Sequence, residues 1–230
     1  MPIRAVLFDY GLTLVGFEFP TDCLLAVLEK ARGWLGDRTP DARWLLFNVL
    51  HPLEAELERF GDDEVDYMTV YTEAWRRAGI EAPRDLLYRV LDLEQRCWDA
   101  AVRLAPFALA TLQRLRELGL RTGVASNAPF PPEMMRRQLV GNGIGERVDA
   151  IVFSAEIGRR KPAPELYRAG LAAIGTEPAE TLYVGDRMVE DYEGPRRIGM
   201  RAVLCTALAR QPPPPGVPTI PTLRELEQVL

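Results

Sequence analysis

Lysine, cysteine and histidine are scarce in this chain. Its 230 residues include only two lysines, Lys30 and Lys161, three cysteines and one histidine. Cys23, Cys97 and Cys205 lie far apart and form no CxxC pair, so neither a zinc site nor a disulfide framework is expected. We predict that the three cysteines are buried free thiols.

Long apolar runs and an excess of positive charge are also missing. No uncharged apolar run approaches the roughly 18 residues of a membrane-spanning helix. Residues 2–4 lead straight into a strand without a small-residue cleavage site, so no signal peptide is expected. The formal net charge is −5 and the arginines are dispersed, whereas nucleic-acid binding needs a basic surface. We expect a cytoplasmic protein that binds neither membrane nor nucleic acid, and its oligomeric state stays open.

The first strand ends in a carboxylate. The apolar residues 6–8 are typical of a buried strand, and they lead directly into Asp9. Gly11 follows as a turn residue, and Thr13 offers a hydroxyl four residues after the carboxylate. In open α/β sheets, polar groups at the carboxyl ends of strands lie at the crevice where ligands bind. We therefore expect Asp9 to lie in a functional site.

The chain contains two kinds of periodicity. Residues 15–104 carry amphipathic helical patterns without a convincing strand, which indicates an inserted all-helical unit. From residue 105 onward, short apolar strands alternate with helices, a spacing typical of βαβ units. We predict one α/β domain from residues 1–14 and 105–230, with a parallel sheet covered by helices on both faces.

Two further expectations concern the helical insertion. His51-Pro52 should break or kink a helix near its middle, because proline lacks the backbone N–H that a helix interior requires. Five aromatic residues are expected to fill the core of the insertion: Trp34, Trp44, Phe47, Trp75 and Trp98.

Polar residues follow the later strands as well. Ser126 and Asn127 end one strand, and Lys161 directly precedes a helix. A helix cap or a solvated basic turn would be the ordinary interpretation of each. However, nearly all the cationic residues of this chain are arginines, so a lysine at this position favours a specific role for its compact charge. A hydroxyl, an amide and the N–H groups of a helix N-terminus together favour phosphate binding.

Two carboxylates follow another strand. Asp186 and Asp191 lie five residues apart around a turn, and the parallel sheet brings them to the same crevice as Asp9. They could form a solvated acidic loop. Together with Asp9, they also offer the oxygen ligands that Mg²⁺ prefers.

The order of these motifs resembles the haloacid dehalogenase-like hydrolase superfamily. The resemblance covers essentially the whole chain, with the helical insertion directly after the first motif. It implies a Rossmann-like core and a mobile helical cap. The motifs that carry it are Asp9-x-x-x-Thr13, Ser126, Ser154-Ala155-Glu156-Ile157-Gly158 leading into Lys161-Pro162, Gly185-Asp186-x4-Asp191, and Gly194-x4-Gly199-Met200.

The resemblance also implies an activity. A member of the phosphatase type removes phosphate from a small phosphorylated metabolite through an aspartyl-phosphate, which here implies Asp9 as the nucleophile. Thr13 would steady the loop that carries Asp9, and Lys161 would offset charge at the phosphoryl group. Ser126 and Asn127, with local N–H groups, would bind the phosphoryl oxygens.

A Mg²⁺ cofactor is part of the same implication. Its ligands would be the carboxylates of Asp9 and Asp186 and the backbone carbonyl of Gly11. Asp191 would be a further ligand, or it would orient the waters of the metal or the lysine.

One position departs from the family pattern. Phosphatases of the family usually carry a second aspartate two residues after the nucleophile, as general acid and base, and this chain has Gly11 there. General acid–base catalysis contributes about 10²- to 10⁴-fold in rate, so we expect slow turnover, a substrate with a good leaving group, or another proton carrier. Tyr10, Glu18 and His51 are the candidates for such a carrier.

Two alternatives remain open. A haloacid dehalogenase also lacks the second aspartate because a halide leaves without a proton, but dehalogenases usually replace the Gly-Asp pair that stands here as Gly185-Asp186. A binding or regulatory protein could have kept the fold and lost efficient catalysis at Gly11.

Overall fold

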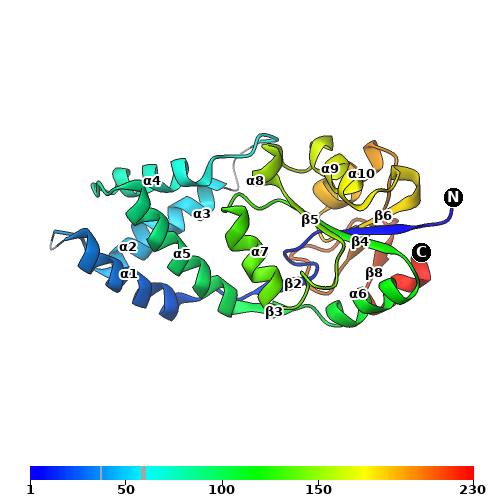
Figure 1. Cartoon of the computed structure of the whole chain (residues 1–230), viewed down its shortest axis with the longest axis horizontal. Helices are drawn as coiled ribbons and strands as arrows, with labels where there is room; N and C mark the ends of the chain where they lie inside the picture. The colour runs from blue at the N-terminus through cyan, green and yellow to red at the C-terminus, as the bar shows by residue number, and fades with distance from the viewer. Residues whose placement is uncertain (37, 58–60) are drawn as a thin grey trace. The chain divides into compact units, whose positions relative to one another are not determined.

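The computed structural model describes residues 1–36, 38–57 and 61–230 (Figure 1). The chain forms two compact units. The first, called the core unit below, comprises Met1–Phe17, Asp62–Glu64 and Val102–Leu230. The second, called the helical unit, comprises Glu18–Gly61 and Val65–Ala101.

A six-stranded parallel sheet forms the centre of the core unit. Its strand order is β5-β4-β1-β6-β7-β8, and every neighbouring pair is parallel. The first strand therefore belongs to the same sheet as the strands of the second half, as the sequence pattern predicts, and the structure places it between β4 and β6. The strands are β1 (Ala5–Phe8), β4 (Arg121–Ser126), β5 (Ala150–Phe153), β6 (Thr181–Gly185), β7 (Arg201–Cys205) and β8 (Thr219–Ile220).

Helices cover both faces of this sheet. Because side chains alternate along a strand, Val6 and Phe8 belong to one apolar cluster, whereas Ala5 and Leu7 belong to another. The first cluster includes residues of α6 (Ala108–Glu117), α7 (Pro132–Gly141) and the 3₁₀ segment η4 (Leu223–Val229). The second includes residues of α9 (Pro164–Ile174).

Shorter helical segments complete the core unit. They are α8 (Ser154–Ile157), the 3₁₀ turn η2 (Pro178–Glu180), the π-helical η3 (Met188–Glu193) and α10 (Gly194–Arg197). The parallel α/β fold expected from the sequence is confirmed.

Two short strands were not expected. β2 (Val15–Phe17) and β3 (Val102–Leu104) pair antiparallel where the chain leaves and re-enters the core unit. The prediction of no strand within residues 15–104 is wrong at both ends of that range. Three-residue strands carry little periodicity, and the pairing partner is distant in sequence, so no local pattern reveals them.

The helical unit contains five α-helices and one π-helical turn among its described residues. They are α1 (Thr21–Leu35), α2 (Ala42–Leu45), η1 (Leu46–Leu50), α3 (His51–Leu57), α4 (Tyr67–Arg77) and α5 (Arg84–Ala101). Trp75 is fully buried, as expected, but Trp44 and Phe47 are 38% and 56% exposed. The prediction that both belong to the core of the unit is wrong, because their helix turns that side toward solvent.

Pro52 does not break its helix. The backbone continues from α2 through η1 into α3, and the N–H of His51 donates to the carbonyl of Leu46, five residues back. A proline interferes with the carbonyl four residues before it, here Asn48. The wider π-helical turn makes room for the proline ring. The predicted kink is therefore observed as a local change from α-helical to π-helical winding.

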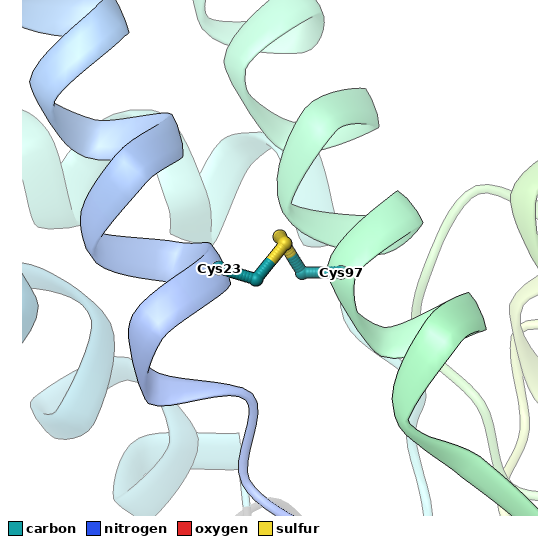
Figure 2. Close-up of a disulfide and its surroundings, with 2 residues drawn as sticks. All are labelled: Cys23 and Cys97. Atoms are coloured by element: carbon teal, nitrogen blue, oxygen red, sulfur yellow. A yellow bond between two sulfur atoms is a disulfide. The ribbon is translucent and has the colours of Figure 1, made fainter.

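The helical unit also contains a disulfide. Cys23 on α1 and Cys97 on α5 are bonded, 74 residues apart in sequence (Figure 2). The prediction of free thiols is wrong for this pair, because the packing of α1 against α5 brings together two cysteines whose spacing gives no sign of pairing. Cys205 is a buried free thiol, as expected, and burial raises its pKa.

We expect the disulfide to stabilise the helical unit. Reduction should lower the free energy of unfolding by about 2–4 kcal/mol, because the bond restricts the unfolded chain. Urea unfolding with and without a thiol reductant measures the difference. The double variant Cys23→Ser/Cys97→Ser is the control and should not respond to reductant. Equal midpoints for the oxidised and reduced natural protein would contradict the expectation.

Candidate active site

Asp9 lies immediately after β1, at the carboxyl edge of the sheet. Its backbone N–H donates to the carbonyl of Val184 at 2.8 Å, which continues the β1–β6 pairing by one residue. Its Oδ1 accepts hydrogen bonds from Ser126 Oγ at 2.7 Å and from Lys161 Nζ at 2.8 Å. The residue is only 8% exposed. The structure thus brings together three of the residues singled out from the sequence.

A tight loop carries the chain away from Asp9. The carbonyl of Tyr10 accepts from the N–H groups of Leu14 and Val15, and Leu12 has a positive φ of 57°. A non-glycine residue in this region is uncommon and marks a constrained backbone. The Thr13 side chain is buried, and its hydroxyl has no hydrogen-bond partner within the described part of the chain.

Lys161 connects the first motif to the last. Its Nζ donates to Asp9 Oδ1, to Asp191 Oδ1 at 2.7 Å and to the Tyr183 hydroxyl at 2.9 Å. Burial disfavours its charge, but the attraction of Asp191 and Asp9 outweighs this effect and raises the pKa of Lys161. The lysine therefore stays cationic. Asn127 fixes its backbone, since Asn127 Oδ1 accepts from the Lys161 N–H at 2.7 Å.

Tyr183 is a site residue that the motifs did not reveal. It lies within β6, where the apolar pattern around it indicated only a buried strand. Its hydroxyl accepts from Lys161 and donates to the carbonyl of Ala125 at 2.6 Å. Burial strongly raises the pKa of this phenol, followed by the charges of Asp191 and Asp9, so it remains a neutral hydrogen-bonding group.

Removing this hydroxyl should cost stability. In Tyr183→Phe, Lys161 loses an acceptor and the Ala125 carbonyl loses a donor, so the free energy of unfolding should fall by about 1–3 kcal/mol. Tyr192→Phe is the matched control because its hydroxyl accepts from the Arg196 guanidinium and donates to no group among the described residues. Urea denaturation compares the two variants, and an equal cost for both would contradict a special role for Tyr183.

Three carboxylates gather at this edge of the sheet. One oxygen from each of Asp9, Asp186 and Asp191 lies within 4.8 Å of the others. Asp191 Oδ2 also accepts from the N–H groups of Asp186 and Arg187, at 3.1 and 2.9 Å. Burial, and then the charges of Asp9 and Asp191, raise the pKa of Asp186 to about 7. Such crowding of oxygen ligands and negative charge fits a hard divalent cation.

Gly185 permits this close approach. A Cβ at this position would overlap the side chain of Asp191. The Gly-Asp pair is therefore a packing requirement as well as a sequence motif.

A pocket of about 220 Å³ opens beside Asp9. Among the residues predicted for the site, Asp9, Gly11, Ser126, Asn127 and Lys161 line it, whereas Thr13, Asp186 and Asp191 are not among the lining residues. Sequence reasoning missed the rest of the lining, which consists of Leu12, Phe17, Arg160, Arg187, Glu190 and Arg210. Only the positions of Arg187 and Glu190, inside the Gly185–Asp191 motif, hinted at their involvement.

The structure also places the three candidate proton carriers. Tyr10 is buried away from the pocket lining, where its hydroxyl donates to Gln138 and accepts from Asn142. Glu18 and His51 belong to the helical unit, and the His51 ring packs against Phe19 and Phe47. Tyr10 is therefore not available to a ligand in the pocket. Glu190 is a carboxylate that does line it.

Comparison with known proteins identifies the family. A family model described as haloacid dehalogenase-like hydrolase matches residues 69–205, more than half of the chain. The chain is a haloacid dehalogenase-like hydrolase. Glyceraldehyde 3-phosphate phosphatase of Methanopyrus kandleri is 31% identical over 217 residues, which cover 87% of this hydrolase and 83% of that protein.

Two further proteins are similar to this hydrolase, one over part of its sequence and the other in fold. Phosphoserine phosphatase of Thermus thermophilus is 38% identical over 100 residues, but the match spans only 44% of this hydrolase and 39% of that protein. A 2-haloacid dehalogenase from Pseudomonas syringae pv. tomato shares the fold, with a TM-score of 0.72 at 19% identity over 99% of this chain and 97% of that one. No helix in the described ranges is long and apolar enough to span a membrane.

Proposed function

We propose that this hydrolase is a Mg²⁺-dependent phosphatase that acts on a small phosphorylated metabolite through an aspartyl-phosphate. The observation that carries the proposal is the environment of the Asp9 carboxylate. Ser126 and Lys161 both hold its Oδ1, and Oδ2 has no hydrogen-bond donor among the described residues. A fixed carboxylate with one free oxygen beside a pocket suits nucleophilic attack.

Charge is the first obstacle to this reaction, because the carboxylate and a phosphate ester are both anionic. Lys161 stays charged next to Asp9 and lowers the repulsion. The carboxylates of Asp9 and Asp186, with the carbonyl of Gly11, would hold Mg²⁺, and Asp191 would lie beside them as a further ligand or an orienting group. When bound, the ion would supply positive charge that offsets the negative charge of the reacting phosphoryl group.

The proposed reaction has two steps, in which each residue of the site has its own role. An oxygen of Asp9 forms a bond to phosphorus as the bond to the ester oxygen breaks, and the departing alkoxide takes a proton from water, because residue 11 is a glycine and cannot donate one. Water next attacks phosphorus, which releases phosphate and restores the carboxylate. Ser126, Asn127 and Lys161 line the pocket where they would bind the phosphoryl oxygens. Thr13 would steady the Asp9 loop through its buried side chain.

The remaining parts of the proposal follow from the fold and the relatives. The helical unit would serve as a cap that selects the organic part of the substrate. The printed names of the curated relatives, glyceraldehyde 3-phosphate phosphatase and phosphoserine phosphatase, support a small phosphorylated substrate. We place the enzyme in the cytoplasm.

A paired assay tests this function. Phosphate release from p-nitrophenyl phosphate and from a panel of phosphorylated metabolites is measured with Mg²⁺ and with EDTA. Chloride release from 2-chloropropionate is measured in parallel. Mg²⁺-dependent phosphate release is expected, whereas chloride release without metal would replace the proposal by a dehalogenase.

Gly11 favours two other functions, because it removes the usual acid. The dehalogenase is the first, although Asp186 stays available as a metal ligand. The second is a binding or regulatory protein without turnover. Beryllofluoride with Mg²⁺ forms an analogue of the phosphoryl-aspartate, so its capture on Asp9 would indicate a competent site. Failure to capture it would favour the second alternative.

A further inference from the structure

Three arginines line the pocket beside the proposed phosphoryl site. Arg160 precedes Lys161, Arg187 follows β6, and Arg210 lies beyond β7, so three separate segments at one edge of the sheet supply them. The proposed reaction at Asp9 uses none of these guanidinium groups. Their convergence therefore needs another explanation.

The three guanidinium groups differ in their partners. Arg160 Nε lies 3.8 Å from Glu64 Oε2, and Arg187 Nη1 lies 3.3 Å from Glu190 Oε1. Lys161, the fourth cation of the pocket, is shared between Asp9 and Asp191. Arg210 has no acidic partner in the described part of the chain. Among the four cations of the pocket lining, Arg210 is thus the one without an ion pair to a described residue.

We propose that Arg210 binds a carboxylate on the organic part of the substrate, with Arg187 as a second guanidinium in the same pocket. The inference rests on the proposed phosphatase function and narrows its substrate class to short phosphorylated carboxylic acids. A guanidinium forms two parallel hydrogen bonds to a carboxylate. One unpaired cation matches the single charge of a carboxylate better than the double charge of a second phosphate.

The size of the pocket limits the rest of the substrate. At about 220 Å³, the pocket is smaller than the roughly 300–1,000 Å³ typical of sites for drug-sized ligands. It suits a phosphoryl group and a carboxylate separated by few carbon atoms.

Two esters of the same length separate carboxylate binding from phosphate binding. 2-Phosphoglycolate carries a carboxylate where ethyl phosphate carries a methyl group. The natural enzyme should favour phosphoglycolate in kcat/KM, and Arg210→Gln should reduce that preference about 10- to 100-fold, the value of charge-assisted hydrogen bonds. Arg210→Lys keeps the positive charge but lacks the planar guanidinium group. Its preference for phosphoglycolate should lie between those of the natural enzyme and Arg210→Gln.

Arg116→Gln is the matched control. Arg116 is an exposed arginine of α6 outside the pocket lining, so its replacement removes the same charge from elsewhere on the core unit. This variant should keep the preference of the natural enzyme. The inference is wrong if Arg210→Gln keeps the preference for phosphoglycolate. It is also wrong if Arg210→Gln and Arg116→Gln lose that preference equally.

A binding measurement keeps this test independent of turnover. Asp9→Asn removes the proposed nucleophile, and calorimetry on this variant with Mg²⁺ gives the affinities for both esters. Tighter binding of phosphoglycolate than of ethyl phosphate, lost when Arg210→Gln is added, supports the carboxylate site. This conclusion holds even if the natural enzyme hydrolyses neither ester, because absent hydrolysis would refute only the phosphatase proposal. Equal affinities for the two esters would refute the carboxylate site while leaving the phosphatase proposal intact.

Discussion

Replacing Asp9 with asparagine should abolish phosphate release while the protein stays folded. An amide oxygen is too weak a nucleophile to attack phosphorus, and removal of a nucleophile typically costs about 10⁴-fold or more in kcat. The amide Oδ1 can still accept from Ser126 and Lys161, so the two hydrogen bonds that hold the side chain can persist. Lys161 also keeps its ion pair with Asp191.

Initial rates with p-nitrophenyl phosphate and Mg²⁺ measure the loss in Asp9→Asn. Circular dichroism and a urea unfolding curve check that the variant is folded. Asp22→Asn, an exposed residue in the first turn of α1, is the matched control and should have the activity of the natural protein. Activity retained in Asp9→Asn would refute the nucleophile assignment, since no other change in this variant could compensate for a missing covalent step.

Introducing an aspartate at Gly11 should raise phosphatase activity. This residue lines the pocket two positions after Asp9, where the family usually carries its general acid and base. A proton donor at this place should increase kcat by about 10²- to 10⁴-fold. The gain should be large for alkyl phosphates, whose alcohol must leave with a proton. It should be small for p-nitrophenyl phosphate, whose phenolate leaves without one.

The local structure accepts this substitution. Gly11 lies outside the left-handed region of backbone space, so a side chain meets no backbone strain there. A Cβ would lie 3.3 Å from Cε2 of Phe17, a close contact. The Phe17 side chain is 39% exposed and can move outward. The carbonyl of residue 11, the proposed metal ligand, is kept.

Gly11→Asn is the control that separates proton transfer from shape. Asparagine has nearly the same volume as aspartate but has no carboxyl group to donate or accept a proton. Steady-state rates with ethyl phosphate and p-nitrophenyl phosphate are compared for both variants. The interpretation fails if the asparagine variant gains as much as the aspartate variant, or if the gain does not depend on the leaving group.

Much of the core was predictable because its signals are local. The apolar stretch before Asp9, the Gly-Asp pair at the end of β6 and the alternation of strands with helices each follow from neighbouring residues. β4 ends at Ser126, where the sequence indicated a strand end, and β6 ends at Gly185, directly before Asp186. The parallel sheet then brings the ends of its strands to one edge, so a shared location for Asp9, Ser126 and Asp186 could be inferred without coordinates.

The missed features depend on contacts between distant segments. β2 and β3 are too short to show a period, and Cys23 and Cys97 become neighbours only through helix packing. Tyr183 had the appearance of a core residue in a buried strand. Its role exists only because Lys161 lies against its hydroxyl.

The sequence by itself determined the parallel α/β core, the helical insertion and the set of motifs after Asp9, because periodicity and strand-end chemistry are written in adjacent residues. Only the tertiary structure decided where the Lys161 charge goes, which of the 26 arginines line the pocket, and that Tyr10 is not available there. Side-chain direction and ion pairing arise from packing between segments that local sequence cannot relate. The motif that begins at Asp9 can thus be identified from the sequence, whereas the side chains that contact Asp9 are known only from the fold.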